Sequence, residues 1–331
     1  QHSVKTLMES GISADIIVCR TEHELSNDLK EKLALFCNVK QKAIIQSIDL
    51  DTIYDVPLMM LDEGLDKVVL EKLKLPTKKS LDLKSWNVFL EKFKNPKHTL
   101  KIGLVGKYVE LQDSYKSILE SLIHAGASNE TEIDVVSIHS EHLEQGDVAK
   151  QLDGLHGLIV APGFGERGIE GKISAIAYAR KNKFPFFGIC LGMQMAVIEY
   201  TRNQIGLVNA NSTEMDPDCK DAVIDLMESQ KSVIKKGGTM RLGAWNCELT
   251  NDSKAAHAYQ SKIISERHRH RYEFNNKYLD RVFDDQFIIA GTNPETGLVE
   301  IVENKNHPWF VGVQFHPEYK STVSNPHPLF V

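Results

Sequence analysis

The sequence has few cysteines, and no two of them stand at metal-binding spacing. Five cysteines are scattered over 331 residues, and no Cys-x-x-Cys pair occurs among them: Cys19, Cys37, Cys190, Cys219 and Cys247. This pattern predicts neither a disulfide framework nor a cysteine-ligated zinc site, and it favours a reducing, cytoplasmic setting.

Long apolar runs and an excess of basic charge are also missing. The longest apolar runs, 157–161 and 184–189, are far shorter than the roughly 20 residues that cross a membrane. The 39 Lys and Arg residues against 45 Asp and Glu residues give a net charge of -6, which argues against nucleic acid or a membrane as the main partner. The length and a hydrophobic content of 42% suit a globular protein of about two domains acting on small molecules.

The first 75 residues alternate between helix and strand. The chain starts at Gln1 without a basic and apolar leader, so we expect a fragment whose N-terminal portion is missing. Apolar periodicity predicts helices and short strands in alternation, which indicates part of an α/β domain: helices 2–9, 23–36 and 53–73, and strands 14–20 and 43–48. Residues 76–98 are predicted to be an interdomain linker, with one short helix whose aromatic face (Trp86, Phe89, Phe93) packs on a neighbour.

Residues 99–331 predict a second, complete α/β domain. Strands and helices alternate up to residue 202, a pattern typical of a parallel sheet: strands 100–105, 133–139, 157–161 and 184–189, and helices 113–125, 170–181 and 191–202. Residues 203–236 are predicted to be irregular. Later β-rich segments predict added antiparallel strands: 240–249, 263–274, 287–292, 298–303 and 309–315.

Cys190 stands where a nucleophile would be expected. An apolar strand leads into Gly188-Ile189-Cys190-Leu191-Gly192, and a helix follows at once. This is the G-x-nucleophile-x-G turn with cysteine in place of serine. The turn lifts the side chain to the C-terminal edge of the sheet, and the helix N-terminus favours a thiolate. An ordinary buried cysteine at a strand–helix junction is the alternative.

Two further groups would complete a cysteine hydrolase site. His316 follows a predicted strand and Glu318 stands two residues on, which suits a general base and the carboxylate that orients it. Backbone N–H groups of Leu191 and of Gly163, in the loop Ala161–Gly165, could bind an oxyanion.

The run Arg267-His268-Arg269-His270-Arg271 allows several interpretations. On a strand the three arginines share one face and the two histidines the other. Nucleic-acid binding and metal binding by the histidines are the less favoured functions. A bidentate contact between one arginine and a substrate carboxylate is favoured, and a solvated charged strand remains the alternative.

Together these residues resemble the class I, triad-type glutamine amidotransferases. The resemblance rests on Gly188–Gln194 (GICLGMQ) and Phe315–Glu318 (FHPE). It implies a flavodoxin-like, mostly parallel sheet with added antiparallel strands. It also implies a glutaminase in which Cys190 attacks the glutamine amide, His316 acts as base and acid, and Glu318 orients His316.

Segments on both sides of the linker resemble the CTP synthase family more narrowly. They include QHSV (1–4), ALFCNV (34–39), VGKY (105–108), ERHRHRYE (266–273) and NHPWF (306–310). The resemblance implies ATP-dependent amination of UTP to CTP, with ammonia supplied by the glutaminase. It places residues 1–75 at the end of a P-loop-type α/β synthase (amidoligase) domain and 99–331 in the glutaminase domain.

The same resemblance implies binding residues. Those for glutamine are Gly163, Leu191, Gly192, Met193, Gln194, Glu214 and Arg271; those for UTP or CTP are Gln1 and Lys32; and Leu50 would contact ATP. For the full enzyme it implies ATP, Mg²⁺, GTP as an activator and a homotetramer. The phosphate loop and magnesium ligands would precede Gln1, so no metal site is expected in this chain. One departure is that the family's P-G-G-F-G loop reads Ala161-Pro162-Gly163-Phe164-Gly165 here.

Two other functions remain open. The chain could serve another synthetase of the class, such as one making GMP or carbamoyl phosphate, although residues 1–75 argue against this. It could also be a non-catalytic nucleotide-binding module with a degenerate glutaminase, which the presence of Cys190, His316 and Glu318 opposes.

Overall fold

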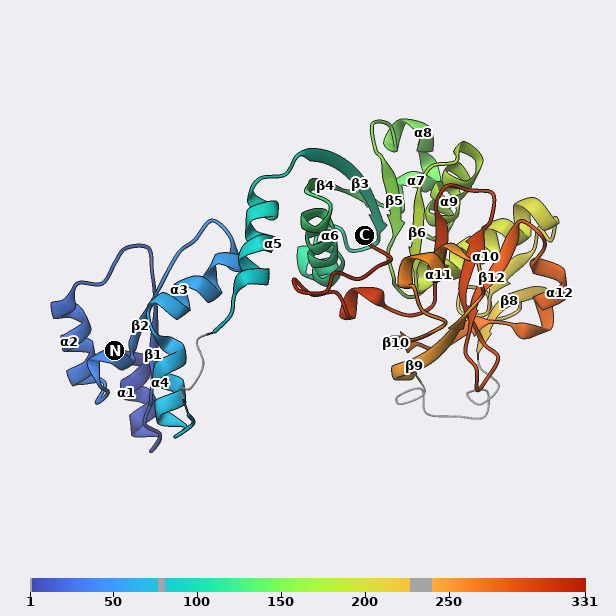
Figure 1. The fold of residues 1–331 in the computed structure, drawn as a ribbon. Coiled ribbons are helices and arrows are strands. Elements are labelled where there is room, and N and C mark those ends of the chain that lie inside the picture. The colour runs from blue at the N-terminus through green and yellow to red at the C-terminus, as the bar shows by residue number, and fades with distance from the viewer. Residues whose placement is uncertain (1, 77–80, 227–239) are drawn as a thin grey trace. The chain divides into compact units, whose positions relative to one another are not determined.

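The computed structural model describes residues 2–76, 81–226 and 240–331 (Figure 1). The chain divides into two compact units, Gln1–Leu90 and Glu91–Val331. Among the described residues, no helix is both long and apolar enough to cross a membrane.

The first unit is a small α/β assembly. Its two parallel strands are β1 (Ile17–Thr21) and β2 (Ile44–Ile48), and its helices are α1 (His2–Glu9), α2 (Asn27–Phe36), α3 (Val56–Asp62) and α4 (Leu65–Lys72). Residues 53–73 are mostly helical, as expected, but they form a short 3-10 turn (Ile53–Asp55) and two separate helices, α3 and α4. Gly64 takes φ 74°, a left-handed conformation that ends α3 and starts α4 at a new angle.

Helix α5 (Lys84–Lys94) presents the aromatic face expected from the sequence. The Trp86 Nε1–H donates to Tyr54 O at 2.8 Å, and the Phe89 ring meets the Tyr54 ring edge-on at 4.9 Å. These contacts attach the start of α5 to the first unit.

The second unit is built on a nine-stranded sheet. Its order is β10-β9-β12-β13-β14-β6-β5-β3-β4. The parallel strands are β3 (His98–Gly106), β4 (Thr131–His139), β5 (Gly157–Val160), β6 (Phe186–Ile189) and β14 (Phe310–Val313). The antiparallel strands are β9 (Arg241–Leu249), β10 (Ile263–His270), β12 (Phe287–Thr292) and β13 (Val299–Asn304). The parallel part has the flavodoxin-like order 2-1-3-4-5, so the predicted fold class is confirmed.

Two expectations about the later chain were wrong. Residues 203–236 are not irregular throughout, because β7 (Ala210–Ser212) and β8 (Asp221–Leu226) lie within them. The segment 263–274 is β-rich as expected, but the strand expected to carry Arg267–Arg271 ends at His270. Residues after Arg271 form a second strand, β11 (Tyr272–Phe274), which joins β8 and β7 in a separate three-stranded sheet. The break places Arg271 outside both strands.

Alternation along the strands buries both faces of the main sheet. Val105, Leu158 and Phe186 face one hydrophobic core, and their neighbours Leu104, Ile159 and Phe187 face another. The first core is covered by α9 (Ile169–Asn182) and α10 (Leu191–Tyr200), and the second by α6 (Lys116–Ser128) and α11 (Lys254–Tyr259). The short helices α7 (His142–Gln145), α8 (Val148–Gln151) and α12 (Leu279–Val282) complete this unit.

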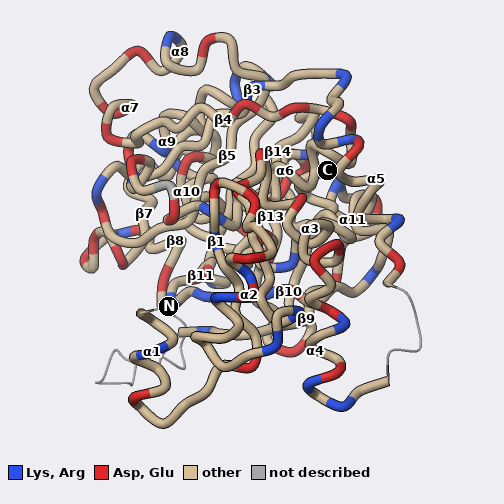
Figure 2. The backbone as a smooth tube through the Cα atoms, turned by 90° about the vertical axis from the view of Figure 1, so that its left-hand side faces the viewer, with Lys and Arg blue, Asp and Glu red and all other residues tan. Residues whose placement is uncertain are grey.

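Charges of both signs are interspersed along the described backbone of each unit (Figure 2). Acidic and basic residues alternate even within short helices, as in Asp66, Lys67, Glu71 and Lys72 of α4. Such a distribution favours local ion pairs over a long-range field of one sign.

Candidate active site

Cys190 occupies a strained turn between β6 and α10. Its φ and ψ are 53° and -103°, a backbone conformation that non-glycine residues rarely adopt and that recurs at functional sites. The Cys190 N–H donates to Val313 O at 2.7 Å, so the end of β6 stays attached to β14. The thiol is therefore presented at the N-terminus of α10, where the first N–H groups have no acceptor within the helix.

The two glycines of the motif allow close backbone approach rather than a left-handed turn. A Cβ on Gly192 would lie 2.2 Å from Val160 O, and a Cβ on Gly188 would lie 2.7 Å from the carbonyl carbon of Gly192. Neither glycine has a positive φ; Cys190 itself does. Any side chain at these positions would push α10 away from β5 and β6.

His316 and Glu318 form a buried pair at the end of β14. The imidazole Nδ1–H donates to Glu318 Oε1 at 2.7 Å, and both side chains are buried. Burial by itself would lower the pKa of His316, but Cys190 and Glu318 beside it raise that pKa well above its usual range. A charged imidazole is therefore favoured next to the Cys190 sulfur.

Two side-chain amides form a chain of hydrogen bonds that ends at the Cys190 thiol. Gln314 Nε2 donates to Cys190 Sγ at 3.7 Å, and Gln194 Nε2 lies 3.1 Å from Gln314 Oε1 and 2.8 Å from Tyr272 O. Gln314 and Gln194 are buried. These hydrogen bonds link the Cys190 sulfur through Gln314 to α10 and β11, in addition to the backbone hydrogen bond of Cys190.

The loop Ala161–Gly165 after β5 is held by two buried lysines. Lys172 Nζ donates to Ala161 O at 2.8 Å, and Lys107 Nζ donates to the carbonyls of Phe164 and Gly165. The Phe164 C=O and the Gly165 N–H belong to one trans peptide and therefore point in opposite directions. The Gly165 N–H is thus turned away from Lys107, and it donates to Glu214 Oε1 at 2.8 Å. The departure from the family's loop sequence therefore leaves the loop anchored at both ends.

A cavity of about 410 Å³ opens over these groups. Its lining combines the cysteine, the loop and the break between β10 and β11: Gly163, Phe164, Cys190, Gln194, Glu214, Met240, Arg269, His270, Arg271 and Tyr272. Leu191 lies beside the loop, with its Cδ2 3.4 Å from the position of a Gly163 Cβ. Gly192 and Met193 lie behind the cavity, against Val160 and Gly312 respectively.

A buried charged cluster supports the cavity wall behind His270. The Arg241 guanidinium pairs with Glu300 at 2.7 Å and with Glu273 at 3.4 Å. His268 Nδ1 and His270 Nε2 lie 2.8 Å apart. Burial, with Arg241 nearby, lowers the pKa of His270 to about 3, so this histidine is neutral. His268 and His270 face inward and Arg267 and Arg269 outward, as the alternation predicted.

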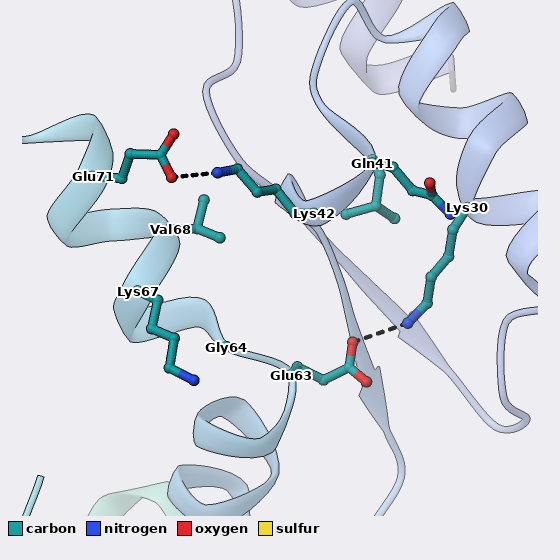
Figure 3. Close-up of a pocket in the computed structure, with 9 residues that line it drawn as sticks. Lys30, Gln41, Lys42, Glu63, Gly64, Lys67, Val68 and Glu71 are labelled. Atoms are coloured by element: carbon teal, nitrogen blue, oxygen red, sulfur yellow. Dashed lines mark hydrogen bonds and ion pairs between the residues drawn. The ribbon is translucent and has the colours of Figure 1, made fainter. Parts of the chain in front are cut away.

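The larger cavity of the first unit, about 540 Å³, does not contain the nucleotide-binding residues expected there. It lies between α2, β2 and α4, and two of its three lining lysines form ion pairs: Lys30 with Glu63 at 3.1 Å, and Lys42 with Glu71 (Figure 3). Lys32 and Leu50 are exposed and do not line it, and Gln1 lies outside the described residues. Across the described ranges, no group of three or more His, Cys, Asp and Glu side chains is arranged to hold a metal.

Sequence reasoning missed Gln314, Lys107, Lys172 and the Arg241 cluster. Gln314 immediately precedes Phe315-His316-Pro317-Glu318, and its place at the end of a strand was a usable signal. Lys172 gave none, because a lysine early in a helix is ordinarily a solvated residue, and Lys107, which follows β3, gave no sign that it would be buried.

Comparison with known proteins covers both units. Residues 110–331 match the family Glutamine amidotransferase class-I, and residues 1–75 match CTP synthase N-terminus. The whole chain is 65% identical to a CTP synthase of Flavobacterium johnsoniae and 53% identical to one of Clostridium acetobutylicum, and in each case it spans 62% of the relative's length. A solved structure described as the glutaminase domain of Trypanosoma brucei CTPS with bound acivicin has a TM-score of 0.66 and 37% identity, covering 70% of this chain and 90% of that one.

The chain therefore belongs to the class I glutamine amidotransferase family, as the fold and the Cys190 turn indicated. Within that family its relatives over the full 331 residues are CTP synthases.

The glycine contacts predict a large cost for a methyl group at Gly192. Gly192→Ala places Cβ against a backbone oxygen that cannot move without shifting β5, so we expect a loss of about 3 kcal/mol or more in unfolding free energy. Gly157→Ala is the control, because its Cβ would meet a flexible Ile102 methyl at 3.2 Å; a loss under about 1 kcal/mol is expected. Urea denaturation measures both, and equal losses would contradict the assigned contact.

Glu273 predicts a pH dependence of stability. Burial, opposed by Arg241, raises its pKa from 4.5 to about 8. The carboxyl loses its proton near pH 4.5 in the unfolded chain and near pH 8 in the folded chain. The stabilising contribution of the protonated Glu273 is therefore complete below pH 4.5 and is lost as the pH rises through 8. Glu273→Gln should remove this loss, so its stability relative to the parent should rise between pH 5 and pH 9, by a few kcal/mol at most. Thermal unfolding across that range measures the difference; a constant difference would contradict the assignment.

Proposed function

We propose that this chain hydrolyses glutamine to glutamate and ammonia through Cys190, His316 and Glu318. The observation that carries the proposal is the coupling of the Cys190 sulfur, in its strained turn, to the buried His316–Glu318 pair. A thiolate beside an imidazolium that a carboxylate orients is the arrangement of cysteine acyl-transfer enzymes.

The proposed reaction has two halves. The Cys190 thiolate attacks the side-chain amide carbon of glutamine, and the carbonyl oxygen becomes an oxyanion near the N–H groups of Gly163 and Leu191. His316 gives its proton to the leaving nitrogen, so ammonia departs and a γ-glutamyl thioester remains. His316 then takes a proton from water, the hydroxide attacks the thioester, and glutamate leaves as the thiolate is restored.

The cavity residues suit the other end of glutamine. The side chain of Arg271 lines the cavity from the break between β10 and β11, where it would pair with the α-carboxylate. Glu214 lines the opposite loop with one oxygen on the Gly165 N–H, and it would accept a hydrogen bond from the α-ammonium. Gln194 would contribute its side chain, and Gly192 and Met193 their backbone at the helix start. We propose that the same cavity accepts acivicin.

We further propose that the ammonia serves the ATP-dependent amination of UTP to CTP in the complete protein. The support is the match of residues 1–75 and the full-length identity to CTP synthases. Gln1 and Lys32 are proposed to contact UTP or CTP, and Leu50 ATP. Mg²⁺, GTP activation, a homotetramer and a cytoplasmic setting belong to the same proposal.

The domain boundaries of the proposal are 1–75 for the synthase part, 76–98 for the linker and 99–331 for the glutaminase. They are supported by the ranges of the two family matches, 1–75 and 110–331.

Removal of the proposed nucleophile should abolish ammonia release. Cys190→Ala and His316→Asn should each leave no glutamine-dependent ammonia above background, and Glu318→Gln should lower kcat by about a hundredfold or more. Cys19→Ser, in the first unit, is the matched control and should keep full activity. Ammonia release by Cys190→Ala at the parent rate would overturn the assignment.

The substrate of the amination distinguishes this proposal from other amidotransferases. The complete protein given glutamine, ATP and Mg²⁺ should convert UTP to CTP, and it should not aminate XMP or make carbamoyl phosphate. Chromatography of the nucleotides measures the products. Glutamine-dependent amination of XMP without CTP formation would contradict the proposal while leaving the glutaminase assignment intact.

A further inference from the structure

Lys172 is a charged side chain without solvent contact beside the proposed oxyanion loop. It extends from the first turn of α9 and is completely buried, with an exposed fraction of 0%. An ammonium group has three N–H donors, and among the described residues its hydrogen-bond partner is Ala161 O at 2.8 Å. The Nζ atom also lies 3.8 Å from the position of a Gly163 Cβ, which places it directly behind the loop.

Packing does not require a lysine at this position. The surroundings in the first core are aliphatic, with Ile169, Ile173 and Ile176 on the same helix, and a methionine would fill the same space. An unpaired buried ammonium is costly, and burial together with the neighbouring Lys107 lowers the pKa of Lys172 to about 7. Buried groups with strongly shifted pKa values cluster at functional sites.

The acidic group that Lys172 faces across the loop is the thiol of Cys190. Gly163, whose Cβ position lies 3.8 Å from Lys172 Nζ, lines the same cavity as Cys190. Cys190 favours the charged form of Lys172, whereas Lys107 opposes it. The carboxylates packed around α9 contact groups other than Lys172. Three of them form ion pairs with arginines: Glu170 with Arg202, Glu199 with Arg180, and Glu141 with Arg167. Glu214 accepts a hydrogen bond from the Gly165 N–H, and Glu144 lies against Gly171. The imidazole of His307, which follows β13, bonds to Ala179 O near the C-terminal end of α9.

We propose that Lys172 is a positioning residue of the glutaminase, whose buried ammonium favours the thiolate of Cys190 and holds the loop Ala161–Gly163 in place through Ala161 O. The proposal rests on the proposed function. It assigns two separable effects, one from the charge and one from the hydrogen bond. The proton on Nζ is not transferred to the substrate in either half of the reaction.

Two substitutions separate these effects. Lys172→Met removes the charge and the hydrogen bond, and Lys172→Gln removes the charge but keeps an N–H donor. Alkylation of Cys190 by iodoacetamide, followed by mass spectrometry of its peptide, reports thiolate formation without any need for activity. In both variants the pH of half-maximal alkylation should rise by about one unit. The kcat for glutamine should fall further in Lys172→Met than in Lys172→Gln.

Lys107→Met is the matched control. It removes the other buried ammonium from the same loop, and the charged groups around Lys107 are Glu214, Arg167, Glu141 and Glu144 rather than Cys190. Its alkylation profile should not move to higher pH even if its kcat falls, because removal of Lys107 favours the charged form of Lys172. Thermal unfolding should show that all three variants are folded.

Two results would overturn the proposal: folded Lys172→Met and Lys172→Gln variants with the parent alkylation profile, or an equal shift in Lys107→Met. Failure of the underlying function would look different, because the parent would then release no ammonia from glutamine, or Cys190→Ala would release it.

Discussion

The close backbone approach at Gly188 and Gly192 is the constraint on which the whole site depends. Val160 O, Gly188 and Gly192 leave no room for a side chain, so α10 can begin immediately where β6 ends. That junction gives Cys190 its positive φ, and the parallel pairing of β6 with β14 then brings His316 to the same edge of the sheet. The strained residue is tolerated because buried strands and helices pack around the turn that holds it.

Charge at this edge is organised in two layers. Cys190 and Glu318 favour the charged form of His316, which places a charged imidazole beside the Cys190 sulfur. Behind the loop, Lys107 and Lys172 bind its carbonyl oxygens, which fixes the opposite wall. Because these groups are shielded from water, their interactions are stronger than at a surface, and the hydrolytic chemistry proposed here follows from that arrangement.

Local sequence signals were sufficient for the fold class and the Cys190 turn, but not for contacts made through space. The glycines that flank Cys190 and the alternating apolar residues of the strands can be interpreted from the residues next to them in the sequence. The break at Arg271 was missed because the run from Ile263 to Phe274 reads as one strand; its end is set by pairing with β8 in another sheet. Lys172 and Arg241 could not be foreseen, since their burial depends on elements far along the chain. The roles of Lys32 and Leu50 remain predictions from resemblance.

The most direct test of the central claim is to find the covalent intermediate. The parent protein is mixed with glutamine, quenched in acid within milliseconds to seconds, digested and analysed by mass spectrometry. The account predicts one γ-glutamyl group on the peptide that contains Cys190, formed before steady-state ammonia release and absent when His316 is replaced by Asn. Ammonia release at the full rate with an unmodified Cys190 peptide at every quench time would contradict it.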